Sequence, residues 1–184
     1  MDHLPASWRL GGAAVTGIDA DPAILFAAHA RAKTAGVKVT LVEGQIERLP
    51  FPDASFDVVL AMTVLCFIAD AASAVREIAR VLRPGDRLVL GVLGRWSVWA
   101  MSRRLRAWFG TATWKAARFR TAGELRALVR QTGLSVWTVR GAVFYPPIGL
   151  CAKVPEPVEG LLGSLSTFGA AFIALSASSS RDSR

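Results

Sequence analysis

Side chains that could bind a ligand follow the first predicted strand of this chain. Residues 14–18 form a short apolar run, and Asp19 and Ala20 come directly after it. Asp21 and Pro22 then open a helix, because aspartate caps helix N-termini and proline suits the first helical position. A carboxylate offers two acceptor oxygens, so Asp19 could accept hydrogen bonds from both hydroxyls of a ribose. The alternative is that Asp19 only shapes the turn.

Strands and helices alternate along the first half of the chain. A glycine at position 36 ends the first helix, whose predicted buried stripe is Ile24, Leu25, Ala28 and Ala32. Further strands are predicted over 37–42, 57–62 and 87–92, a second helix after Asp70, and a turn over 83–86. The uninterrupted apolar run 57–62 is typical of a strand covered on both faces. This alternation predicts an α/β fold with a mostly parallel sheet.

The pattern changes after Gly94. Residues 97–109 have helical periodicity, and Thr121 and Glu124 have the spacing of a capping box, in which each side chain satisfies a backbone N–H group. Two more strands are predicted over 134–141 and 168–175, followed by a polar, disordered tail over 176–184. The length of 184 residues predicts a single domain, 1–175, in which the helical segment 95–130 forms a basic lid.

The positive charge is concentrated in that segment. Residues 95–130 hold nine basic side chains against one acid, Glu124, and this excess equals the net charge of +8 of the whole chain. Such a block favours an anionic partner, and its part 95–120 is a candidate for peripheral contact with a membrane or lipid. The alternative is a solvated helical face, and no nucleic-acid partner is expected.

The remaining composition argues for a reduced, cytoplasmic protein. Cys66 and Cys151 have neither a disulfide framework nor the spacing of a metal site, so no metal is predicted. No run of 18 apolar residues could span a membrane, and the first residues lack the order of a signal peptide.

Three motifs in order give the chain a family resemblance. They are Val-Thr-Gly-Ile-Asp-Ala-Asp-Pro at 15–22, Leu-Pro-Phe-Pro-Asp-Ala-Ser-Phe-Asp-Val-Val at 49–59, and Glu-Ile-Ala-Arg-Val-Leu-Arg-Pro-Gly-Asp-Arg-Leu-Val-Leu at 77–90. Together they resemble the class I S-adenosylmethionine-dependent methyltransferases of the ubiquinone/menaquinone-biosynthesis type. The resemblance implies a Rossmann-like sheet whose final strand is antiparallel, S-adenosyl-L-methionine as cofactor, and a small, partly apolar methyl acceptor.

The resemblance also assigns the cofactor contacts. Asp19 and Ala20 would lie at the ribose, and Gln45 and Ile46 at the adenine, with Met62 as a further contact. The family usually has an acid at the position of Gln45, whose neutral amide oxygen accepts more weakly. A solvated loop explains Gln45 equally well.

The acceptor pocket is predicted after the next two strands. Its candidates are Thr63, Cys66, Trp96 and Trp99, each with core packing as the alternative, which is favoured for Cys66. Methyl transfer depends mostly on positioning and desolvation, so no catalytic residue is predicted.

The chain departs from the family at its start. Residues 8–12 resemble the end of the helix that normally follows the glycine-rich loop, so we expect the first strand and that loop to be absent and the sheet to be N-terminally incomplete. The main hypothesis is therefore a methyltransferase, active or inactive in this form. One alternative is a non-catalytic remnant that binds a protein partner through an unpaired strand edge. Another is an NAD-dependent dehydrogenase, which the later motifs do not support.

Overall fold

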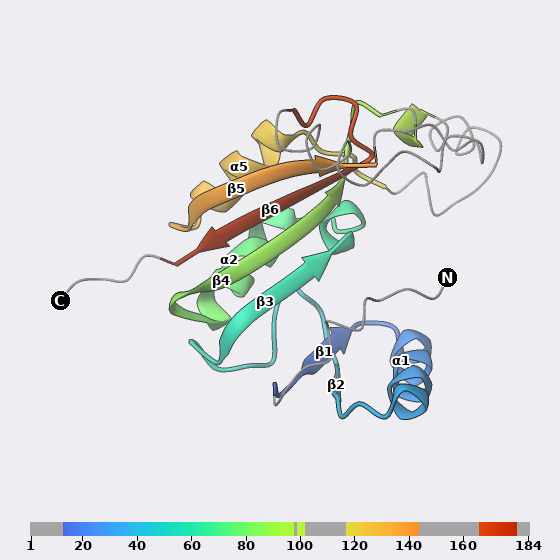
Figure 1. Cartoon of the computed structure of the whole chain (residues 1–184). Helices are drawn as coiled ribbons and strands as arrows, with labels where there is room; N and C mark the ends of the chain where they lie inside the picture. Colours follow the sequence, from blue (N-terminus) through green and yellow to red (C-terminus); the bar gives the residue numbers. More distant parts are fainter. Residues whose placement is uncertain (1–12, 98, 102–116, 144–165, 180–184) are drawn as a thin grey trace. The chain divides into compact units, whose positions relative to one another are not determined.

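The chain divides into two compact units. The computed structural model describes residues 13–97, 99–101, 117–143 and 166–179 (Figure 1). One unit ends at Arg48 and the other begins at Leu49, so each is described by itself. The predicted single domain over 1–175 stays a prediction. The resemblance of residues 8–12 to a helix end lies outside the described residues.

The first unit is a helix beside two parallel strands. Strand β1 (Thr16–Asp19) pairs with β2 (Thr40–Glu43), with Thr16 opposite Thr40 and Asp19 opposite Glu43. Helix α1 (Pro22–Ala35) begins as predicted, because the Asp21 side chain accepts a hydrogen bond from the Ala23 N–H. It ends at Gly36, whose φ of 65° lies in the left-handed region that glycine adopts without strain.

Two predictions for this unit were wrong. Helix α1 has no fully buried residue: Leu25, Ala28 and Ala32 are only half-buried, and Ile24 is 52% exposed. Within its unit, α1 packs against two strands of four residues each, which cover too little surface to bury a whole stripe. Strand β2 also begins at Thr40, three residues later than expected, because residues 37–39 take no part in pairing.

The second unit is built on a four-stranded sheet with the order β3-β4-β6-β5. The strands are β3 (Phe56–Met62), β4 (Leu82–Leu93), β5 (Ser135–Ala142) and β6 (Phe172–Ser178). Strands β3 and β4 are parallel, and β6 is antiparallel to both β4 and β5. The predicted sheet, mostly parallel in its first strands with an antiparallel final strand, is therefore confirmed.

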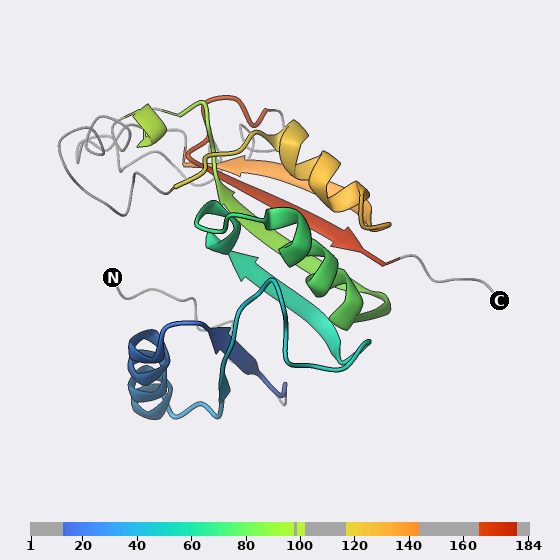
Figure 2. The ribbon, with the colours of Figure 1, turned by 180° about the vertical axis from the view of Figure 1, so that it is seen from behind.

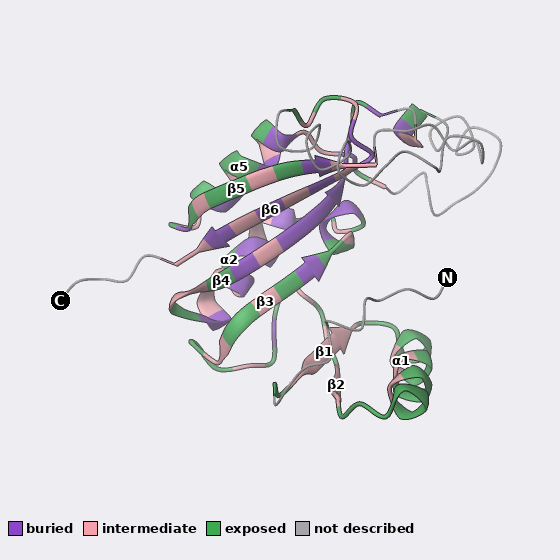
Figure 3. Cartoon of the chain, viewed as in Figure 1, coloured by how far each residue is buried: buried purple, intermediate pink, exposed green. Residues whose placement is uncertain are grey.

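Two helices cover one face of this sheet (Figure 2). Helix α2 (Ala71–Val81) and helix α5 (Ala122–Arg130) lie side by side on it. Their capping residues are the predicted ones, Asp70 and Thr121. The core between helices and sheet is fully buried, as the purple segments of Figure 3 show, and includes Val75, Ile78, Leu88, Leu90, Leu125, Val129 and Leu175.

On the opposite face of the sheet, β3 is exposed, so the prediction that this strand is covered on both faces was wrong. Val58, Leu60 and Met62 alternate along β3 and are 58%, 49% and 41% exposed, so this strand is not covered on both faces by the described residues. An apolar run alone does not show which elements will cover it. In the described part of the chain, no helix combines the length and apolarity needed to cross a bilayer.

Strand boundaries also differ from those predicted. Strand β4 starts at Leu82, which pairs with Phe56, while Arg87 pairs with Val58. Residues 83–86 therefore bulge out of the strand instead of forming a separate turn before it, and the φ of 87° at Gly85 permits the bulge. Strand β6 extends to Ser178, so the start of the predicted tail at residue 176 was wrong.

One arginine holds the loop that enters β3. Arg80 on α2 donates to the Glu77 and Asp53 carboxylates and to the carbonyl oxygens of Phe51 and Leu49. Glu77 also accepts from the Leu49 N–H at 2.9 Å. The hydrogen bonds to Glu77 and then to Asp53 raise the pKa of Arg80 above its ordinary value. The loop 49–55 is thus fixed to α2 by these side chains, together with hydrogen bonds from the Ala54 and Ser55 N–H groups to the Arg80 and Val81 carbonyls.

Candidate functional site

The carboxyl ends of β1 and β2 meet at one edge of the first unit. The Gly44 N–H donates to the Asp19 carbonyl at 3.0 Å, so the loop after β2 lies against the end of β1. Asp19 Oδ1 accepts from the Asp21 N–H at 2.9 Å, which fixes the half-buried carboxylate. Its Oδ2 forms no hydrogen bond with a described residue. Asp19 therefore combines a turn-shaping role with an oxygen, Oδ2, that is not used by the described part of the chain.

The other predicted nucleoside contacts lie at the same edge. Ala20 is exposed next to Asp19. Gln45 is exposed and starts a turn closed by the Arg48 N–H, which donates to the Gln45 carbonyl at 3.1 Å. Ile46, inside that turn, is half-buried. The structure thus brings Asp19, Ala20, Gln45 and Ile46 to one end of a two-stranded sheet, and their ligand roles stay predictions.

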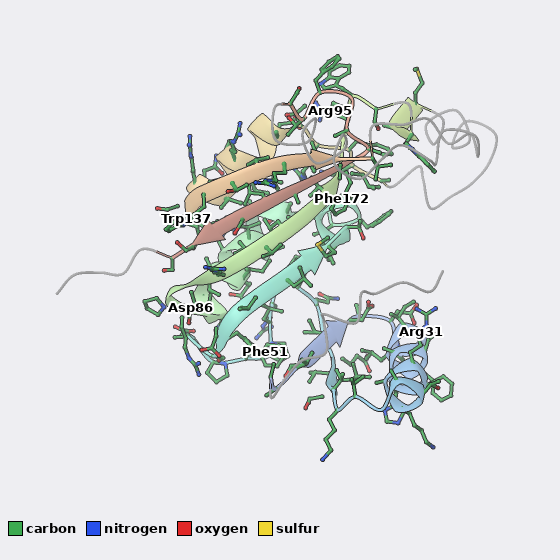
Figure 4. All side chains as sticks on the ribbon, in the orientation of Figure 1. Arg31, Phe51, Asp86, Arg95, Trp137 and Phe172 are labelled. Atoms are coloured by element: carbon green, nitrogen blue, oxygen red, sulfur yellow. The ribbon has the colours of Figure 1, made fainter. Side chains whose placement is uncertain are left out.

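In the second unit, Met62 and Thr63 lie at the carboxyl end of β3. Met62 pairs with Gly91, where a Cβ would come within 2.8 Å of the Met62 sulfur and would overlap the Phe172 ring. Glycine at this position therefore lets Met62 and Phe172 lie over β4; Figure 4 labels Phe172. Thr63 has a φ of 63°, which is strained for a β-branched residue, and its N–H donates to the Gly91 carbonyl at 2.7 Å.

Cys66 lies deeper than the other candidates. Its side chain is 0% exposed, and its sulfur accepts a hydrogen bond from the Leu93 N–H at 3.2 Å. Its carbonyl accepts from the Arg118 N–H at 2.7 Å. This placement favours the packing role, in which Cys66 joins the end of β4 to the segment before α5. Among the described residues, no cluster of three or more His, Cys, Asp or Glu side chains could hold a metal ion.

The two tryptophan candidates follow β4. Trp96 is 59% exposed and Trp99 is half-buried. Most of the lid predicted around them, including the helix over 97–109, lies outside the described residues. Trp96 lines a cavity of about 270 Å³ at this end of the sheet, together with Arg95, Arg120, Thr121, Arg126 and Phe168.

Backbone pairing builds this cavity, and sequence reasoning missed it. Gly94 and Arg120 form a parallel bridge: the Arg95 N–H donates to the Arg120 carbonyl at 3.0 Å, and the Arg120 N–H donates to the Leu93 carbonyl at 3.1 Å. Gly94 and Arg120, 26 positions apart in sequence, therefore become neighbours. The basic block and the capping box were visible in the sequence, but no local signal showed that this bridge would join them.

Glu124 connects the capping box to the cavity. It accepts from the Thr121 N–H at 2.8 Å, and its other oxygen pairs with Arg95 Nη1 at 2.8 Å (Arg95 is labelled in Figure 4). Burial opposes the charged form of Glu124, but the Thr121 hydrogen bonds and the charges of Arg95 and Arg120 outweigh it, so the pKa of Glu124 is lowered. The carboxylate therefore stabilises this end of the fold only while it is ionised.

A Glu124→Gln variant tests that contribution. Glutamine keeps the capping geometry and loses the charge, so we expect the free energy of unfolding at pH 7 to fall by about 0.5 kcal/mol, as for other partly exposed ion pairs. Because the folded pKa lies below the ordinary value of 4.5, this contribution is complete above that value and is lost as the pH falls through the folded pKa.

Urea unfolding of both proteins over a series from pH 7 down to about pH 3 measures the effect. The difference between the two proteins should shrink at the acid end. Glu43→Gln, at an exposed carboxylate of β2, is the matched control and should show no such difference. A Glu124→Gln deficit that stays constant down to the lowest pH would contradict the ionic explanation.

Comparison with known proteins relates part of the chain to one family. Residues 3–90 match the family described as a methyltransferase domain. A crystal structure of an S-adenosylmethionine-dependent methyltransferase, a possible histamine N-methyltransferase from Thermotoga maritima, superimposes with a TM-score of 0.71 at 27% identity, covering 88% of this chain and 72% of that one. Residues 3–90, just under half of the chain, are therefore similar to the methyltransferase domain family, and the fold is that of the class I methyltransferases.

Curated relatives of the methyltransferase domain are longer than this chain. An uncharacterized protein of Mycobacterium tuberculosis is 37% identical over 146 residues, which cover 79% of this chain and 49% of the relative. A ubiquinone biosynthesis O-methyltransferase of Methylobacterium is 33% identical over 143 residues, which cover 75% of this chain and 57% of that protein. The chain thus spans about half the length of the curated relatives it matches.

Proposed function

We propose that this chain is an S-adenosylmethionine-dependent methyltransferase whose first unit binds the nucleoside part of the cofactor. One observation carries the proposal: the Asp19 carboxylate is fixed through Oδ1 at the end of a parallel strand, and its Oδ2 has no hydrogen bond to any residue that the structure describes. An acid with this geometry fits a ribose diol, because a carboxylate is a stronger acceptor than a neutral group and has lone pairs for both hydroxyls even when Oδ1 accepts one backbone bond. The methyltransferase domain over 3–90 supports the choice of cofactor.

The loop after β2 supplies the adenine contacts in this proposal. The exposed Gln45 amide oxygen accepts from the adenine amino group, and the half-buried Ile46 packs against the ring. Ala20 leaves the space beside Asp19 free of a larger side chain. The Gln45–Arg48 turn holds both loop residues near the end of β1, since Gly44 is hydrogen-bonded to Asp19. In the second unit, the exposed Met62 is a proposed apolar contact of the cofactor.

The proposed acceptor is a small molecule with apolar bulk. The exposed Trp96, the half-buried Trp99 and the strained Thr63 follow the carboxyl ends of β3 and β4, where sheets of this kind bind ligands. Cys66 would support this pocket from beneath, given its burial. The ubiquinone biosynthesis O-methyltransferase among the relatives is consistent with such an acceptor.

Methyl transfer requires that the cofactor and the acceptor be positioned, and it does not require a catalytic side chain. S-adenosylmethionine, when bound, supplies a methyl group that is already electrophilic. The residues of this chain orient the cofactor and the acceptor and exclude water from between them. Asp19 fixes the ribose, Ile46 shields the ring, and Trp96 and Trp99 would provide apolar surface for the acceptor.

Calorimetric titration of the full chain with S-adenosylhomocysteine tests the proposed cofactor. This product contains the same nucleoside, so we expect saturable one-to-one binding, together with weaker binding of adenosine alone. Circular dichroism of the same sample serves as the folding control. A folded chain that binds neither compound would contradict the proposal.

A further inference from the structure

We propose that the arginine cavity of the second unit binds an organic anion whose acidic group meets Arg120, Arg126 and the start of α5. The cavity is the one of about 270 Å³ between the end of β4 and α5. The next inference rests on the proposed methyltransferase function: the anion is the methyl acceptor, and the cavity holds its acidic end. The acceptor would then be a ring-bearing carboxylic acid or a molecule of equivalent shape and charge.

The charges in the cavity are not balanced. Three arginines line it, and among the described residues only Arg95 forms an ion pair with a carboxylate, that of Glu124. Neither Arg120 nor Arg126 forms an ion pair with a described residue. The Nε atom of Arg120 is buried without any hydrogen-bond partner. The buried Nε leaves part of the guanidinium charge of Arg120 without a hydrogen-bond partner, and an anion beside this guanidinium would compensate for that charge.

The first turn of α5 adds neutral donors. The capping box occupies the N–H groups of Thr121 and Glu124. The N–H groups of Ala122 and Gly123 belong to the first turn, where no carbonyl of the helix can reach them. Both residues line the cavity. A helix N-terminus carries a partial positive charge, so these donors and the arginines favour the same ligand charge.

The remaining walls fit a ring. Trp96 is 59% exposed and Phe168 is 76% exposed, and both line the cavity beside the arginines. Ile173 contributes buried apolar surface. The volume is slightly below the roughly 300 Å³ at which pockets for drug-sized ligands begin, so it suits one acidic group with one ring system. A purely solvated basic face would have neither these aromatic walls nor a buried Arg120 Nε atom.

Calorimetric titration of the full chain with 2-naphthoate tests the proposal. The controls are the neutral 2-naphthamide, which has the same ring, and inorganic phosphate, which has charge but no ring. We expect 2-naphthoate to bind one-to-one and at least about tenfold more tightly than either control, since hydrogen bonds to charged groups are typically worth that factor or more. No cofactor is present, so a failure here is distinct from a failure to bind S-adenosylhomocysteine.

Substitutions of single arginines test whether 2-naphthoate binds in this cavity. Arg120→Gln should weaken 2-naphthoate binding about tenfold and Arg126→Gln by a smaller factor, and the exposed Arg126 keeps the test valid if Arg120→Gln does not fold. Arg130→Gln removes the same charge from the last turn of α5, away from the cavity, and should change nothing. Glu124→Gln frees Arg95 from its partner and should strengthen binding.

Three results would overturn the proposal. Equal binding of 2-naphthamide and 2-naphthoate would show that charge plays no part. Equal binding of phosphate and 2-naphthoate would show that the aromatic walls play none. An Arg130→Gln variant that loses as much affinity as Arg126→Gln would show a general effect of net charge instead of a site at this cavity.

Discussion

A Gly94→Ala variant loses about 2 kcal/mol or more of the free energy of unfolding, by the cost of overpacking a closed site. A Cβ at position 94 would overlap the carbonyl oxygen of Ala170 and come within 3.2 Å of its carbonyl carbon. Both atoms belong to the backbone, so no side-chain rotation can relieve the overlap. The Gly94 N–H also donates to the Ala171 carbonyl at 2.9 Å, which holds the two segments together.

The same change should disturb the arginine cavity. Gly94 is bridged to Arg120 and precedes Arg95. A shift of the Gly94 backbone away from Ala170 would therefore displace both arginines. Urea unfolding measures the loss of stability, and 2-naphthoate titration measures the second effect. Gly123→Ala is the matched control for stability, because its Cβ would meet nothing closer than Thr121 Oγ1 at 3.9 Å and alanine favours the helix. Equal stability of Gly94→Ala and the parent chain would contradict the close approach of the two backbones.

Asp19→Ala is expected to weaken S-adenosylhomocysteine binding by about 10- to 100-fold, the usual range for hydrogen bonds to a charged group. Asp19→Asn should have a smaller effect, because the amide oxygen still accepts but without charge. The affinity is lost because the ribose hydroxyls no longer have the Asp19 carboxylate as hydrogen-bond acceptor. Adenosine should therefore bind the parent chain more tightly than 2′,3′-dideoxyadenosine. In Asp19→Ala this preference should disappear, which isolates the pairwise interaction.

Asp21→Asn is the matched control for Asp19. It removes one negative charge two residues away, while asparagine remains an equally good helix cap for α1. We expect its affinity for S-adenosylhomocysteine to stay within about twofold of the parent chain, as for a screened exposed charge. An unchanged affinity in Asp19→Ala would remove Asp19 from the site, and an equal loss in Asp21→Asn would point to a general electrostatic effect.

The features that the sequence predicted well are those encoded locally. Asp21, Gly36, Asp70 and the Thr121–Glu124 capping box mark helix ends through contacts within a few residues, and each lies where it was expected. The antiparallel last strand followed from the family resemblance. The meeting of Asp19 and Gln45 at one edge could also be anticipated, because parallel neighbours such as β1 and β2 bring their carboxyl ends together.

The features that could not be predicted depend on pairing between distant segments. The bulge over 83–86 appears only when Leu82 is paired with Phe56. The exposure of Val58 and Leu60 depends on which elements cover β3, and an apolar run does not carry that information. The arginine cavity depends on the Gly94–Arg120 bridge, and its aromatic wall includes Phe168 from a third segment.

The position of β6 sets the order in which the second unit can assemble. It is the last described strand along the chain, yet it lies between β4 and β5 in the sheet. Among the described strands, β5 pairs with β6 alone. During synthesis, β5 therefore cannot join the sheet until β6, about 30 residues downstream, has been made. Such non-local pairing slows folding, because loop closure must precede the stabilising contacts. Until β6 is made, β4 has an unpaired edge on that side, and such an edge favours association between newly made chains.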